Sequence, residues 1–199
     1  VADNGSDDDS ITYLETAFPT VGIIALNKNY GYAEGYNRAL AQLEAEYFVL
    51  LNSDVEVTDG WLTPMIELLD KNSLVAACMP KIMSSERRNL FEYAGAAGGF
   101  IDRYGYPFCQ GRIFDSDETD YGQYDKSRDV FWASGACMMV RGPLFKLAGG
   151  LDPDFFAHME EIDLCWRLKN RGYRIMYEAG SLVYHLGGGT LPQGNPRKT

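Results

Sequence analysis

The run Tyr47 to Leu51, YFVLL, restricts the fold of this chain more than any other stretch. Five aromatic and aliphatic residues stand together without polar alternation, which favours a strand buried on both faces, as in a parallel sheet. The run ends abruptly at Asn52-Ser53-Asp54. Ligands of open α/β sheets bind beyond the carboxyl ends of the strands, so Asp54 is the first candidate for a functional site. The alternative is an Asx-type turn, whose side chains only satisfy loop backbone.

Strand and helix patterns alternate around this run. Val21 to Leu26 and Leu74 to Pro80 have the apolar character of buried strands. Tyr32 to Glu46 and Gly60 to Lys71 carry apolar residues three and four apart, as helices do. We therefore expect an α/β fold in one domain over residues 1–199, with a mostly parallel central sheet and helices on both of its faces.

Residues 86–128 interrupt this alternation. The segment is rich in Gly, Tyr, Phe and Asp and contains turn pairs such as Tyr104-Gly105 and Tyr121-Gly122. This composition predicts short irregular β-structure or a long surface loop. Loops of this length are often binding loops, but the aromatic residues serve equally well in packing.

The alternation resumes after residue 128. Val130 to Arg141 reads as a strand, in which Gly135 marks a bulge or a close approach. Glu160 to Asn170 has the pattern of a helix, and Tyr173 to Tyr177 and Ser181 to His185 read as two final strands. His185 thus ends a strand as Asp54 follows one.

Asp54, Glu160, Glu161 and His185 are residue types that form a metal-dependent site. Carboxylates and an imidazole hold divalent cations, and oxygen-rich sites favour Mg²⁺ or Mn²⁺. Such a metal would neutralise a diphosphate, while a separate carboxylate would act as general base. Taken singly, His185 reads as a core histidine, and Glu160-Glu161 as a charge pair at the positive end of a helix.

Composition excludes some functions. The net charge of −10 argues against a nucleic-acid partner, since phosphate backbones need basic patches. No apolar run approaches the roughly 20 residues that span a bilayer, and no signal peptide is visible. The four cysteines form no Cys-x-x-Cys pair, which favours buried thiols in a reducing cytoplasm. The expected location is therefore the cytoplasm or the inner face of the cell membrane.

The first residues indicate that the chain begins inside a domain. Val1 and Ala2 resemble the end of a strand, and Asp3-Asn4-Gly5-Ser6 the turn that leaves it. The alternative is a disordered acidic tail.

Seven segments in order carry a family resemblance: DNGS, NYGYAEGYNRAL, LLNSDVEV, SGACMMVRGPLF, GGLDPDFF, EEIDLCWRL and YHLGG. Together the segments resemble inverting glycosyltransferases of family two with the GT-A fold, above all the rhamnosyltransferase-like branch that builds bacterial cell-surface polysaccharides. In this family a first strand-helix unit precedes the segment that corresponds to Val1. The last residues, QGNPRKT, also stop where relatives continue into helices that approach the membrane.

The resemblance implies a role for each matching residue. Glu161 would deprotonate the acceptor hydroxyl, and Glu160 and Trp132 would contact the acceptor. Asp54 and His185 would hold Mg²⁺ or Mn²⁺. The implied donor-binding residues are Asp3, Gly31, Asn37, Arg38, Asn52 and Asp54.

Two positions depart from the family pattern. Asn52 stands at the first position of the Asp-x-Asp motif, which leaves one carboxylate fewer for the metal. Glu161 stands where the family has Asp, and the extra methylene could misplace the base; a shift of about 1 Å can cost on the order of 10²-fold in rate.

The implied partners are a UDP- or dTDP-sugar donor and a glycan or lipid-linked acceptor. Peripheral membrane association of the full-length protein and a homodimer are further expectations. Two alternatives stay open: a sugar nucleotidyltransferase, and a non-catalytic module that binds sugar nucleotides.

Overall fold

The computed structural model describes residues 1–93, 95–114, 116–155 and 158–186. The helices of these residues are α1 (Ser10–Ala17), α2 (Tyr32–Leu40), α3 (Leu62–Lys71), α4 (Gly142–Ala148) and α5 (Glu160–Asn170). The strands of the main sheet are β3 (Tyr47–Leu51), β4 (Val55–Val57), β5 (Val75–Ser84), β10 (Arg128–Val130), β11 (Cys137–Arg141) and β12 (Arg174–His185). The other strands are short: β1 (Ala2–Asp3), β2 (Ile24–Ala25), β6 (Gly99–Ile101), β7 (Pro107–Cys109), β8 (Arg112–Ile113) and β9 (Ser116–Asp117). Residues 193–199, at which the chain was expected to stop short, lie outside the described residues.

The central sheet is mixed, so the prediction of a mostly parallel sheet is wrong. Its strand order is β10-β12-β5-β11-β3, with β4 paired to β12. Only β12 and β5 pair in parallel among these neighbours. β3 and β5 do run in the same direction, as a strand-helix-strand unit requires. However, β11 lies between them and runs antiparallel to both, which converts one expected parallel pairing into two antiparallel ones.

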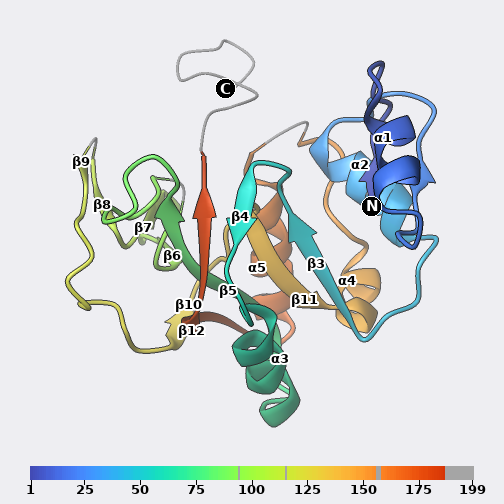
Figure 1. The fold of residues 1–199 in the computed structure, drawn as a ribbon. Helices are drawn as coiled ribbons and strands as arrows, with labels where there is room; N and C mark the ends of the chain where they lie inside the picture. Colours follow the sequence, from blue (N-terminus) through green and yellow to red (C-terminus); the bar gives the residue numbers. More distant parts are fainter. Residues whose placement is uncertain (94, 115, 156–157, 187–199) are drawn as a thin grey trace.

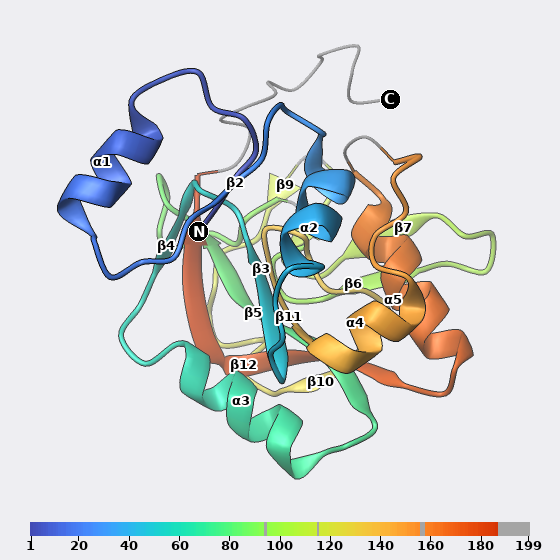
Figure 2. The same cartoon turned by 90° about the vertical axis from the view of Figure 1, so that its right-hand side faces the viewer.

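Helices cover both faces of the sheet, as predicted (Figures 1 and 2). On one face α3 buries Met65 and Leu69 against Cys78 of β5 and Met139 of β11. The larger cluster on the other face includes apolar residues of α2, α4 and α5. The sheet therefore separates a small apolar layer from the main core.

β3 is less buried than its sequence predicts. Phe48 and Leu50 are buried in the main core, but Tyr47, Val49 and Leu51 are only half-buried. β3 is the last strand of the sheet in the described part of the chain, and the small layer beneath α3 covers its second face only in part. The apolar run thus belongs to a strand with one well-covered face.

The N-terminal segment forms a separate small sheet on the β3 side of the molecule (Figure 1). Ala2 pairs with Ile24 and Asp3 with Ala25 in parallel register, so a strand does end at Asp3. The strand expected over 21–26 is limited to β2. α1 has no buried residue, which explains why its sequence carries little helical patterning.

The excursion of residues 86–128 contains two small antiparallel pairs, β6 with β7 and β8 with β9. It is attached to the sheet through Lys81 of β5, whose buried ammonium group contacts Asp120 at 2.8 Å and Asp125 at 2.5 Å. The expectation of irregular β-structure is confirmed.

Two strand predictions in the second half differ from the structure. The strand expected over 130–141 is divided into β10 and β11, because the chain turns at Gly135 and Ala136. Conversely, the two strands expected over 173–185 form one strand, β12, with an irregular register between Glu178 and Leu182. No helix of the described residues is long and apolar enough to cross a membrane.

Candidate active site

Asp54 lies at the carboxyl end of β3, in the turn that leads to β4. The backbone N–H of Asn52 donates to the carbonyl of Ala136 at 3.0 Å, which joins this turn to the start of β11. Val55 of β4 is then the register partner of His185 at the end of β12. Sequence positions 131 residues apart therefore meet, and His185 Nε2 lies 3.2 Å from Asp54 Oδ1.

His185 also contacts Glu92, a residue that sequence reasoning missed. His185 Nδ1 lies 3.4 Å from Glu92 Oε1, and Glu92 is only 3% exposed. Burial of the ring lowers the pKa of His185, but the close contact with Glu92 and the charges of Glu92 and Asp54 outweigh this effect and raise it. Asn52 completes the group, with Nδ2 3.5 Å from His185 Nε2. The imidazole is therefore enclosed by two carboxylates and one amide.

Asp54 and His185 fit the ligands of an octahedral divalent cation. Ligand atoms about 2.1 Å from Mg²⁺, at right angles, lie about 3 Å apart. The 3.2 Å between Asp54 Oδ1 and His185 Nε2 is compatible with this arrangement. Among the described residues no cluster of three or more His, Cys, Asp or Glu side chains has metal-binding geometry. Protein would thus supply two ligands, and substrate oxygens and water the rest, as is usual for Mg²⁺.

Glu160 and Glu161 begin α5, as predicted. His158 and Met159 precede them with φ of 73° and 75°, a left-handed conformation that costs non-glycine residues on the order of 1–3 kcal/mol each. This bend directs the first turn of α5 into the protein, where Glu160 is 4% exposed. In the part of the chain that the structure describes, Oε2 of each carboxyl group is buried without a hydrogen-bond partner.

Both carboxyl groups have raised pKa values. Burial and then the charge of Glu161 raise the pKa of Glu160 to about 7. Burial also raises the pKa of Glu161, although hydrogen bonds from nearby backbone amides oppose it. A carboxyl group with a raised pKa is a stronger base once it ionises. The pair is therefore suited to proton transfer near neutral pH.

Tyr32 and Gly135 form the wall beside Glu161. Tyr32 donates its hydroxyl hydrogen to the carbonyl of Gly135 at 2.6 Å. A Cβ at Gly135 would lie 3.2 Å from the Tyr32 hydroxyl and 3.7 Å from the carboxyl carbon of Glu161. Ala136, the next residue, accepts the hydrogen bond from Asn52. The segment Gly135-Ala136 thus connects the Glu161 side of the site with the Asp54 side.

Asp3 and Gly31 are brought into one N-terminal unit. Asp3 Oδ2 accepts hydrogen bonds from the backbone of Gly5 and Ser6 at 3.0 and 3.1 Å, and hydrogen bonding from Ser6 is the largest cause of its lowered pKa. Asn4 donates to the carbonyl of Gly31 at 2.9 Å. Gly31 has a φ of 79°, which a glycine adopts without strain. The contact of these residues with a donor stays a prediction.

The other predicted binding residues have internal partners. Both polar atoms of the Asn37 amide bond to the backbone of Leu151, at 2.7 and 2.9 Å. Arg38 pairs with Glu34 at 2.7 Å. Trp132 is buried, donates from Nε1 to the carbonyl of Phe100 at 2.9 Å, and packs on glycines of the excursion. This geometry does not bring Asn37 or Trp132 to the acidic groups, and their roles in donor and acceptor binding stay predictions.

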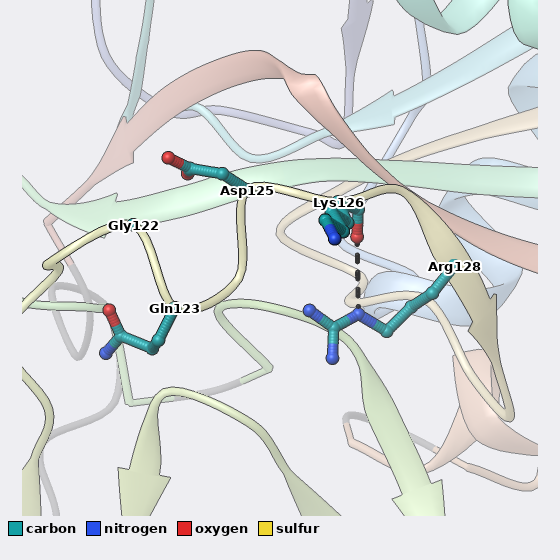
Figure 3. Close-up of a pocket in the computed structure, with 5 residues that line it drawn as sticks. All are labelled: Gly122, Gln123, Asp125, Lys126 and Arg128. Carbon is teal, nitrogen blue, oxygen red and sulfur yellow. Dashed lines mark hydrogen bonds between the residues drawn. The ribbon is translucent and has the colours of Figure 1, made fainter.

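A cavity of about 530 Å³ lies elsewhere, at the end of the excursion. Its lining residues come from the segment before β10 and from β10 itself: Gly122, Gln123, Asp125, Lys126 and Arg128 (Figure 3). Arg128 Nε donates to the carbonyl of Lys126 at 3.3 Å, so these two hydrogen-bonding groups of the lining already have each other as partners. None of these residues belongs to the acidic groups described above, and the cavity is not the centre of the site.

Comparison with known proteins identifies the family of this chain. Residues 1–144 match the family described as Glycosyl transferase family 2. A similar curated protein is N-acetylglucosaminyl-diphospho-decaprenol L-rhamnosyltransferase of Mycobacterium tuberculosis, 27% identical over 93% of this chain and 65% of the relative. Rhamnosyltransferase WbbL of Escherichia coli is 23% identical over 74% of this chain and 58% of the relative. This chain therefore spans less than two thirds of the length of these relatives.

Solved structures share the fold at low identity. GalNAc-T7, crystallised with UDP, GalNAc and Mn²⁺, aligns with a TM-score of 0.67 and 12% identity over 92% of this chain and 36% of that one. Mannosyltransferase PcManGT of Pyrobaculum calidifontis, in complex with GDP-Man and Mn²⁺, has a TM-score of 0.63 and 14% identity over 98% and 48% of the two chains. These likenesses show a GT-A-like α/β fold with a mixed central sheet. The sequence match covers well over half of the chain, and the chain thereby belongs to glycosyl transferase family 2.

Proposed function

We propose that this domain binds a nucleotide-diphosphate sugar, UDP- or dTDP-linked, and that its whole protein transfers the sugar with inversion to a glycan or lipid-linked acceptor. Family membership and the rhamnosyltransferases among its relatives support a role in cell-surface polysaccharide synthesis. One observation carries the proposal. The pair Asp54 and His185 and the pair Glu160 and Glu161 lie on two sides of the same segment, Gly135-Ala136.

Glu161 is the general base of this proposal. Its Oε2 is buried and has no hydrogen-bond partner among the described residues, so one oxygen is free to accept a proton. Burial raises its pKa, which makes the ionised carboxylate a stronger base. The side chain is longer than the Asp expected at this position, and a Cβ at Gly135 would lie 3.7 Å from its carboxyl carbon, an ordinary van der Waals contact.

Asp54 and His185 hold the leaving-group side of the donor. A bound Mg²⁺ or Mn²⁺ would supply positive charge to the departing diphosphate. One carboxylate oxygen of Asp54 and the Nε2 atom of His185 lie 3.2 Å apart, and both would contact this cation. Asn52, in place of the first Asp of the motif, would add an amide rather than a charge to this side.

The reaction is a single in-line displacement. The acceptor oxygen forms a bond to the anomeric carbon as the bond from that carbon to the diphosphate breaks, and the diphosphate leaves with the electron pair. The acceptor proton passes to Glu161. Positive charge develops on the sugar ring, as in other glycosyl transfers with an oxocarbenium-like transition state. Glu160 lies beside the base and would contact the acceptor or the donor sugar.

The family match favours glycosyl transfer over nucleotidyl transfer. A non-catalytic sugar-nucleotide module is the remaining alternative, because Glu161 departs from the family's Asp. Donor hydrolysis or transfer by the full-length protein, lost in Glu161→Gln, would exclude this alternative.

Calorimetric titration of the full-length protein with UDP and with dTDP, each with and without Mn²⁺, tests the proposal. We expect binding that requires Mn²⁺, that is lost in Asp54→Ala, and that persists in the control Glu67→Gln. Glu67 is a suitable control because it is an exposed carboxylate that pairs with Lys71 on α3. Wild-type protein that binds neither nucleotide would overturn the proposal.

A further inference from the structure

Glu92 lies immediately beside the β5 strand, in a segment that adds to the sheet. Phe91 forms an antiparallel bridge with Met83, and the backbone N–H of Glu92 donates to the carbonyl of Ile82 at 3.1 Å. Glu92 therefore has a fixed backbone position, although it belongs to the excursion. Its carboxylate is buried, which is costly for a charged group unless a suitable partner accompanies it.

Register places Glu92 and His185 on the same face of the sheet. Val183 of β12 is the partner of Ile82, and Ile82 lies beside Glu92. Partners across neighbouring strands share a face, and residues two apart on a strand also share it. His185 is two residues beyond Val183, so its side chain projects on the face of Glu92. The contact between them follows from the pairing of three neighbouring segments.

The two ring nitrogens of His185 face different carboxylates. Nε2 lies at hydrogen-bond distance from Asp54 Oδ1, 3.2 Å, whereas Nδ1 makes a close contact of 3.4 Å with Glu92 Oε1 that does not have hydrogen-bond geometry. A neutral imidazole has one N–H, and the position of that hydrogen decides which nitrogen has a lone pair. If Nδ1–H donates to Glu92, the Nε2 lone pair faces Asp54 Oδ1. Two such acceptors facing each other require a proton or a cation between them.

We propose that Glu92 is a positioning residue that fixes His185 in the tautomer with hydrogen on Nδ1, so that Nε2 and Asp54 together bind the divalent cation. This inference rests on the proposed function, because it assigns the purpose of Glu92 to the cation site at Asp54 and His185. Histidines that bind metals commonly donate their second N–H to a carboxylate, which orients the ring and increases the basicity of the ligand.

Cation affinity tests this role. Mn²⁺ is titrated into full-length protein saturated with UDP, and free Mn²⁺ is followed by electron paramagnetic resonance. We expect Glu92→Gln, which keeps the side-chain shape, to weaken Mn²⁺ binding about 10- to 100-fold. The control is Glu118→Gln, a carboxylate of the same excursion whose Oε2 accepts hydrogen bonds from Gly111 and Tyr124. A purely structural role of Glu92 would lower thermal stability in both variants and leave Mn²⁺ affinity unchanged.

The tautomer is measured without metal or nucleotide. The chain has two histidines, His158 and His185, so long-range ¹H–¹⁵N correlation spectra of the imidazoles are readable, and His158→Gln assigns them. At alkaline pH, where the ring is neutral, we expect hydrogen on Nδ1 of His185 in the wild type. In Glu92→Gln we expect a mixture of tautomers or the Nε2–H form, because the amide can donate to Nδ1.

The outcomes separate the inference from the proposed function. Wild-type protein that binds no Mn²⁺ with UDP overturns the cation site and the function with it. Wild-type protein that binds Mn²⁺, together with Glu92→Gln that binds it equally well, overturns the role of Glu92 alone. Hydrogen on Nε2 in the wild type also overturns that role, and this measurement needs no folded variant of Glu92.

Discussion

The two acidic groups of the site have opposite surroundings. Asp54 and Glu92 face an imidazole, whose pKa their charges raise. Glu160 and Glu161 are consecutive residues in the first turn of α5, and burial raises the pKa of both. Under the proposed function, the same side-chain chemistry would hold a cation at the strand ends and carry a proton at the helix start. The difference lies in the available partners, not in the number of carboxylates.

Removing the proton carrier should have the largest effect. Glu161→Gln keeps the shape of the side chain but cannot accept the proton, so we expect the transfer rate to fall about 10²- to 10⁴-fold. Affinity for UDP with Mn²⁺ should remain, since the strand-end group is intact. Rate and binding are measured on the same full-length preparation, with Glu67→Gln as control. A normal transfer rate in Glu161→Gln would show that Glu161 is not the general base.

Removing a residue of the proposed cation site should lower the affinity for Mn²⁺ more than the transfer rate. His185→Gln loses the Nε2 ligand, and we expect Mn²⁺ affinity in the presence of UDP to fall by more than the about 10- to 100-fold assigned to Glu92→Gln. The turnover at saturating Mn²⁺ and donor should change less than in Glu161→Gln. The Mn²⁺ dependence of the transfer rate provides both values. An unchanged dependence would show that His185 belongs only to the core.

The raised pKa of Glu160 predicts a pH-dependent stability. Its folded pKa of about 7 lies above the ordinary value of 4.5, so the folded protein binds this proton more tightly than the unfolded chain does. The contribution to stability is full below pH 4.5 and is lost as the pH rises to about 7. The loss is on the order of 3 kcal/mol.

Glu160→Gln should remove this pH dependence. Urea unfolding at pH 5 and pH 8 should show the variant gaining stability relative to the wild type at the higher pH. Glu67→Gln, which changes an exposed carboxylate, should show no comparable gain. Equal pH dependence in wild type and Glu160→Gln would mean that burial does not shift this group.

The smallest effect is expected for the hydrogen bond between Tyr32 and Gly135, beside Glu161. Tyr32→Phe removes the hydroxyl that donates to Gly135, and we expect a loss of stability of about 1 kcal/mol. The transfer rate should fall several-fold because Gly135 borders Glu161, while Mn²⁺ affinity stays unchanged. Tyr13→Phe, on the exposed face of α1, is the matched control. A Tyr32→Phe variant that weakens Mn²⁺ binding would show that the two groups are not independent.

Local signals were sufficient to predict several parts of the site. The acidic start and the glycine-terminated end of α5 are sequence-local, and the helix has the predicted bounds. Asp54 and His185 were predicted from the same signal, a polar residue at the end of an apolar strand, and the structure brings them together.

Long-range pairing was not predictable in the same way. The insertion of β11 between β3 and β5 depends on contacts between distant segments, and a strand-helix-strand pattern carries no information about it. Glu92 was missed for a related reason. Its signal is a single carboxylate in the run Leu90-Phe91-Glu92-Tyr93, and only the pairing of Phe91 with Met83 reveals its position next to His185.

The attachment of the excursion through Lys81 has a consequence for how proteins of this kind diversify. Asp120 and Asp125 bind one lysine of β5, and Glu92, near the start of the excursion, is secured on the same strand. Outside the bridge between Gly99 and Trp132, the interval between these two anchors can therefore change in length and composition while His185 keeps its position. Under the proposed function, selection for new acceptors would act on that interval and leave the residues proposed to activate the donor unchanged.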